Sequence, residues 1–144
     1  MRNKFTIFII LGLFTTTQSV MSQNVGHTRP LLTVKEIMNG IITPATAIIW
    51  GAYQLQSEAE WLEVQSAALA VIGAGNLLTL GGAAEGELAL ADEANWIKFN
   101  NDMIMAARDV IVAIEARNEE MMSEVGNNSL YPPCESCHQQ YQAQ

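Results

Sequence analysis

Residues 33–55 read TVKEIMNGIITPATAIIWGAYQL, and their apolar side chains recur at alternating intervals of four and three. The repeating positions are Val34, Met38, Ile41, Ala45, Ile48, Ala52 and Leu55. This spacing places one apolar stripe along a helix and is typical of the seam of a helical bundle. Because Pro44 lacks a backbone N–H, we expect a kink or a break near Thr43.

Three further segments have the same helical periodicity, and no segment shows the alternation expected of a strand. We predict helices over residues 58–80, 88–116 and from 118 through 125, with a glycine-rich connector at 81–86. Ser57 followed by Glu60 predicts a capping box, and Asn118 is a good N-cap. Four amphipathic segments with short connectors predict an all-α fold, specifically an antiparallel four-helix bundle.

The chain contains two cysteines, and both lie in the pentad Cys134-Glu135-Ser136-Cys137-His138. C-x-x-C-H is the attachment sequence of a c-type haem, in which each thiol forms a thioether with one vinyl group and the histidine binds the iron. A redox dithiol, half of a zinc site, and a chance pairing in a structural bundle without haem are the alternatives. Neither a preceding strand nor a full set of zinc ligands supports the first two, since outside the pentad only His27 is a donor of the usual kind. The pentad therefore predicts one covalent haem c.

The approach to the pentad is irregular, because Gly126, Asn127 and Asn128 and then Pro132 and Pro133 interrupt the helical pattern. Leu130, Cys134, Cys137 and Tyr141 nevertheless keep a four-three-four spacing. This spacing predicts a kinked or restarted terminal helix with both cysteines on its core side.

The N-terminus has the pattern of an export signal. Arg2 and Lys4 precede an apolar run at residues 5–14, which is too short to span a bilayer. We predict a signal peptide over residues 1–22, a haem domain over 23–144 and a periplasmic protein without stable membrane insertion after cleavage. An uncleaved N-terminal anchor is the alternative.

The net charge of −8 becomes −10 without residues 1–22, because the rest of the chain has five basic and fifteen acidic residues. An acidic surface disfavours binding to nucleic acid and to anionic lipid, and it can attract a redox partner with a basic surface. A generic soluble surface is the other interpretation of this charge. No paired acid and base or nucleophile accompanies the pentad, so we do not expect an enzyme.

A C-x-x-C-H motif near the end of an exported helical chain resembles the class II c-type cytochromes, the cytochrome c prime family. The likeness is sharpest from Cys134 to Tyr141, which matches the family's C-x-x-C-H-x-x-Tyr ending, and Trp96 is a looser match. Gln142 departs from the basic residue that is common there, and the family's usual first-helix arginine is not evident. The resemblance implies haem held at one end of the bundle, contact between Tyr141 and the cofactor, and a possible homodimer.

The first helix decides the function of such a haem. In low-spin relatives a methionine of this helix is the sixth iron ligand, and Met38 stands where such a ligand would belong, which would suit electron transfer. In high-spin relatives an apolar side chain covers the iron, and Ile41 or Ile42 could do so here, which would suit binding of nitric oxide or carbon monoxide. Met38 as an ordinary core residue is a further alternative. The weaker candidates for the ligand are Met103, Met105, Met121 and Met122.

Overall fold

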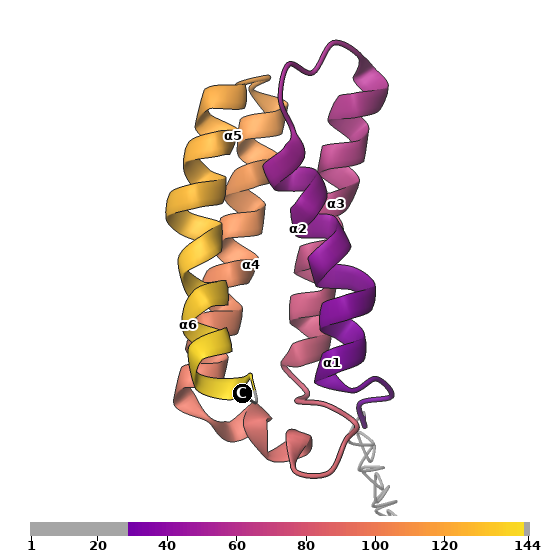
Figure 1. The fold of residues 1–144 in the computed structure, drawn as a ribbon, viewed down its shortest axis with the longest axis vertical. Helices are drawn as coiled ribbons and strands as arrows, with labels where there is room; N and C mark the ends of the chain where they lie inside the picture. Colours follow the sequence, from indigo (N-terminus) through magenta and orange to yellow (C-terminus); the bar gives the residue numbers. More distant parts are fainter. Residues whose placement is uncertain (1–28, 143–144) are drawn as a thin grey trace, which may run out of the picture.

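The computed structural model describes residues 29–142, and over this range every regular element is a helix (Figure 1). The all-α prediction is therefore confirmed for the described residues. The predicted signal peptide at 1–22 and His27 lie outside them. The elements in chain order are α1 Val34–Ile37, η1 Met38–Ile42, α2 Thr43–Gly51, α3 Glu58–Leu78, η2 Glu87–Asp92, α4 Ala94–Glu115, α5 Glu119–Val125, η3 Gly126–Leu130 and α6 Tyr131–Tyr141.

Two groups of helices lie lengthwise beside each other (Figure 1). The first group consists of α3 and of the unbroken helical segment α1–η1–α2, hereafter the first segment. The second consists of α4 and of the unbroken segment α5–η3–α6, hereafter the last segment. Because α3 packs against α2 on one side and α4 on the other, it joins the two groups. The end of α6 lies at the same end of the molecule as the start of α1 (Figure 1).

The helix continues through Pro44, so of the two predicted outcomes, a kink or a break near Thr43, the break does not occur. Instead η1 is a π-helical turn, in which the N–H of Thr43 donates to the carbonyl of Met38, five residues earlier. Such a turn holds one residue more than an α-helical turn and so changes which side chains face the core. The buried positions are Ile37, Ile42, Ala45, Thr46 and Ile49. Ile41 and Ile48, which the periodicity places on the seam, are only half-buried.

A second wide turn precedes the pentad. In η3 the N–H of Tyr131 donates to the carbonyl of Gly126, and Pro132 and Pro133 follow within the first turn of α6. Here too the helix continues instead of restarting. In both segments a five-residue turn is followed by one residue and then by proline, which has no N–H for the α-helical bond.

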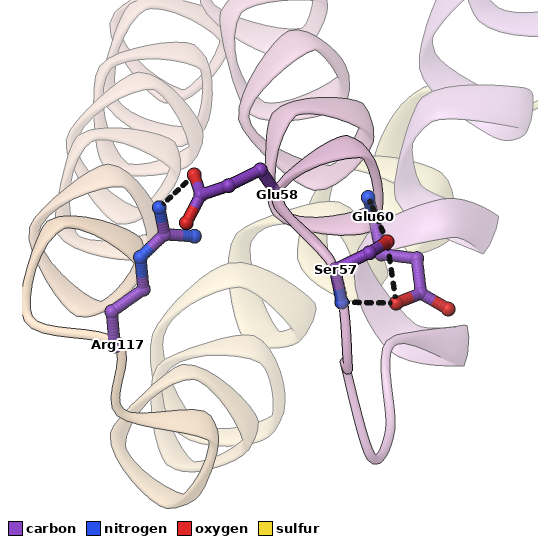
Figure 2. Close-up of polar contacts among 4 residues, drawn as sticks. All are labelled: Ser57, Glu58, Glu60 and Arg117. Carbon is purple, nitrogen blue, oxygen red and sulfur yellow. Dashed lines mark hydrogen bonds and ion pairs between the residues drawn. The ribbon is translucent and has the colours of Figure 1, made fainter.

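The end of the molecule remote from the last residues of α6 is held by caps and an ion pair (Figure 2). Ser57 and Glu60 form the predicted capping box, since the Ser57 hydroxyl accepts from the Glu60 N–H and the Glu60 carboxylate accepts from the Ser57 N–H. Arg117 pairs with Glu58, and its guanidinium lies 5.0 Å from the centre of the Trp61 ring. The predicted N-cap at Asn118 is also confirmed, because its side chain accepts from Met121 N at 2.9 Å.

Among the described residues, α3 alone has the length and apolar composition of a membrane-crossing helix. Within its most apolar stretch, 44% is buried inside the protein. Core helices of soluble proteins meet the same criterion, so this property is weak evidence for a membrane span.

Candidate functional site

A cavity of about 330 Å³ lies between the first segment, α4 and α6. Apolar groups form most of its wall, and the polar groups are few. The lining residues are Met38, Ile42, Thr43, Thr46, Ala47, Trp50, Leu78, Trp96, Phe99, Asn100, Met103, Pro133, Cys134, Cys137 and His138. A small number of polar groups in an apolar cavity is typical of cofactor and ligand sites.

Four of the five site residues predicted from the sequence line this cavity. Cys134, Cys137 and His138 come from α6, while Met38 comes from η1, near the opposite end of the described chain. Both cysteines and Met38 are half-buried, and His138 is exposed at the rim. The structure thus brings the pentad and the candidate first-helix ligand to one site.

The thiols of the pentad lie in an apolar setting. Burial raises the pKa of Cys134 to about 11, with a smaller contribution from Cys137, and burial also raises the pKa of Cys137. The Cys134 thiol donates to the carbonyl of Leu130 at 3.2 Å. Because redox-active dithiols have lowered thiol pKa values, this environment does not favour a thioredoxin-like function.

Tyr141, the fifth predicted site residue, does not line the cavity but lies behind Trp96, which does. The two rings meet edge to face, with centroids 5.3 Å apart and planes at 87°. The Tyr141 hydroxyl donates to Glu93 at 2.9 Å, and Asn95 donates to Gln140 at 3.0 Å. These contacts attach the end of α6 to the start of α4, close to His138.

Two buried polar side chains of the wall were not expected from the sequence. The Thr46 hydroxyl donates to the carbonyl of Ile42 at 2.9 Å, and the Asn100 amide donates to the carbonyl of Gly75 at 2.9 Å. Asn100 Oδ1 has no hydrogen-bond partner. The sequence does contain one indication that Asn100 lies on the apolar face of α4. It follows Trp96 by four residues and precedes Met103 by three, which places the three side chains on one helical face.

The structure shows which of the side chains predicted to lie over the iron line the cavity. Ile42 lines the cavity and Ile41 does not. Of the alternative methionines, Met103 lines it, whereas Met105, Met121 and Met122 do not. Met103 belongs to α4, the helix against which α6 itself packs, while Met38 belongs to the first segment, which lies in the other group of helices (Figure 1).

The residues present suit haem c. Cys134, Cys137 and His138 line an apolar cavity from α6, and the thioether of Met38 lines it from another helical segment, η1. Within residues 29–142, no group of three or more His, Cys, Asp or Glu side chains is placed to hold a bare metal ion. Comparison with known protein families, with curated proteins and with solved structures finds no match to this chain. A functional assignment therefore depends on the residues of the cavity.

Proposed function

We propose that this chain is a periplasmic monohaem c-type cytochrome that transfers electrons. The observation that carries the proposal is that Cys134, Cys137 and His138 line the same apolar cavity as Met38. We further propose that the first segment, α3, α4 and the last segment form an antiparallel four-helix bundle with haem at one end, as in the class II cytochromes c that the pentad's position resembles. Residues 1–22 would be removed on export.

In this proposal each residue of the pentad has a separate role. Cys134 and Cys137 would hold the porphyrin through two thioether bonds, and His138 would be the proximal axial ligand of the iron. The bound haem supplies one-electron redox chemistry. The apolar wall, with Trp96 and Phe99, would exclude water and pack against the porphyrin.

Met38 is our proposed sixth ligand. A thioether that completes the coordination of the iron raises the reduction potential and suits outer-sphere electron transfer. Met103 is the rival thioether in the cavity, but it lies on the helix that packs against α6. Its location makes it a matched control for Met38.

The second candidate function is a five-coordinate haem protein that binds nitric oxide or carbon monoxide. The presence of Ile42 beside Met38 in the cavity wall favours this alternative, because an isoleucine over the iron would leave a small apolar space. The two functions differ in which of these side chains covers the iron.

Expression in a haem-attaching host tests both the cofactor and its ligand. Mass spectrometry should show the increment of one haem, and a chain exported without it would overturn the proposal. We expect a low-spin ferric spectrum that becomes high-spin in Met38→Ala and is unchanged in Met103→Leu. A high-spin wild-type protein whose ferrous form readily takes up carbon monoxide would instead establish the gas-binding function.

The charges are segregated in a way that supports a basic redox partner. Residues 85–135, which include α4 and most of the last segment, carry eleven acidic and three basic side chains. Opposite charge steers the encounter of redox proteins and weakens with added salt. We therefore propose that the partner docks on the acidic half of the molecule, which also carries the pentad.

Two stretches without charged side chains, in the first segment and α3, support a homodimer. Residues 37–57 and 64–84, which include α2 and most of α3, contain no charged side chain, yet Leu69 and Leu77 of α3 are exposed. Two acidic chains could associate through this face without repulsion between like charges. Light scattering should show a dimer that Leu69→Glu converts to a monomer, and a wild-type monomer would contradict this assignment.

A further inference from the structure

In the first segment, the residues that line the cavity are not spaced as on one regular helix. After the wide turn η1, the lining side chains include Thr43, Ala47 and Trp50, which lie on one face of α2. Within the turn, the first residue, Met38, and the last, Ile42, line the cavity. Asn39, the neighbour of Met38, is exposed and does not.

In a regular helix a different residue would line the cavity. Counting back from Ala47 and Trp50 in turns of about 3.6 residues leads to about position 39, which is Asn39, and not to position 38. The extra residue held by the five-residue turn moves this position back by one, to Met38. The wide turn therefore places a thioether where a regular helix would place an amide.

Pro44 and Thr46 account for the position of this turn. Pro44 cannot donate to Gly40, and its ring would collide with the Gly40 carbonyl in a regular helix. Gly40 itself is unconfined, because a Cβ built on it meets no atom within 4 Å. On the other side of the turn, the buried Thr46 hydroxyl donates to the carbonyls of Ile42 and Thr43, at 2.9 and 3.2 Å.

We propose that Pro44 is a positioning residue, which holds η1 as a wide turn and thereby presents Met38 instead of Asn39 to the face of the cavity opposite the pentad. Its role as regards the iron depends on the proposed function. Its effect on which side chain faces the cavity, that of residue 38 or that of residue 39, does not depend on the proposed function.

Two variants separate the turn from other effects of losing proline. Pro44→Ala restores the missing N–H, so the helix can become regular and turn Asn39 inward. Pro44→Ala combined with deletion of Gly40 also permits a regular helix, but the deletion removes the extra residue and returns Met38 to the cavity. Since nothing packs where a Gly40 side chain would be, the deletion removes no side-chain contact.

The first measurement uses Asn39→Cys in each background, with alkylation of residue 39 followed by peptide mass spectrometry. We expect fast labelling beside Pro44, a rate about tenfold or more lower in Pro44→Ala, and recovery in the variant that also lacks Gly40. Equal labelling of all three proteins, or no recovery on deletion, would overturn the proposal. Circular dichroism checks that each variant is folded before its rate is compared.

The second measurement is the ferric spectrum of the haem-loaded proteins with Asn39 intact. The low-spin signature should be lost in Pro44→Ala and regained in the variant that also lacks Gly40. A low-spin spectrum that survives Pro44→Ala unchanged would contradict the positioning role. If no haem is attached to the wild type, the proposed function fails, while the labelling of residue 39 still decides the role of Pro44.

Discussion

The indole N–H of Trp50 donates to the carbonyl oxygen of Gly126 at 3.1 Å, which joins α2 to the wide turn η3. A Cβ on Gly126 would lie 3.3 Å from Trp50 Cδ1, so the absence of a side chain permits this close approach. Trp50 lines both the cavity that contains the pentad cysteines and a neighbouring one of about 280 Å³. Trp50 therefore borders both cavities and links the first and last segments.

Trp50→Phe should lower the free energy of unfolding by about 1 kcal/mol, the usual net value of one hydrogen bond. The phenyl ring keeps an aromatic side chain at this position but cannot donate to Gly126. Urea unfolding measures the change, with Tyr53→Phe on the exposed surface as a control expected to stay within about 0.5 kcal/mol of wild type. Equal stability of Trp50→Phe and wild type would show that the hydrogen bond contributes nothing.

Two glycines of α3 should respond in opposite ways to alanine. A Cβ on Gly75 would lie 2.5 Å from Ile104 Cγ1 and 3.2 Å from Asn100 Oδ1, so Gly75→Ala should destabilise the protein by about 1–3 kcal/mol. A Cβ on Gly73 meets no atom within 4 Å, so Gly73→Ala should stabilise it by up to about 1 kcal/mol through helix propensity. Thermal unfolding of the two variants tests this prediction. A change in stability of the same sign in both would refute the close packing of α3 on α4.

The capping box of α3 predicts a pH-dependent contribution to stability (Figure 2). Hydrogen bonds from Gln56 N–H and from the Ser57 hydroxyl and N–H hold the pKa of Glu60 below its ordinary value. The stabilisation is thus complete above the ordinary pKa of glutamate and is lost as the pH falls through the lowered value. Between about pH 6 and pH 3, Glu60→Gln should lose less stability than wild type does.

Ser57→Ala tests the same cap without a change of charge. It should cost about 1 kcal/mol at neutral pH, because the N–H of Glu60 loses its acceptor. Urea unfolding of this variant and of Glu60→Gln at several pH values separates the two contributions. Parallel pH profiles for Glu60→Gln and wild type would argue against the cap as a titrating element.

The pentad thiols should be slow nucleophiles in the folded, haem-free chain. With the pKa of Cys134 raised to about 11, its thiolate fraction at about pH 8 is roughly a hundredfold lower than that of a thiol with the ordinary value. Alkylation of the folded, haem-free chain should be slower by that order at Cys134, and the same chain in denaturant is the control. Equal rates in the two states would mean that the folded chain does not bury this thiol.

Much of the helical layout could be read from local patterns. Ser57 with Glu60 and Asn118 marked helix starts, because capping depends on residues a few positions apart. Of the seam positions predicted over 33–55, Ala45 is buried and Met38 lines the cavity, but Ile37, Ile42 and Ile49 are buried although the periodicity did not select them. Periodicity assumes a constant turn, whereas the wide turn η1 holds one residue more. Asn100 and Thr46 were not predicted as parts of the wall, because a position on the apolar face of a helix, such as that of Asn100 between Trp96 and Met103, does not show that this face lines a cavity.

The sequence by itself determined the helical character of the chain, the caps and the chemical nature of the pentad, because each depends on residues adjacent or one turn apart. Only the tertiary structure decided that Met38, Met103 and the pentad share one cavity, that Ile42 lines it in place of Ile41, and that Tyr141 lies behind Trp96. These relations depend on how separate helices pack and on one extra residue in a wide turn. No periodicity within a single segment specifies them.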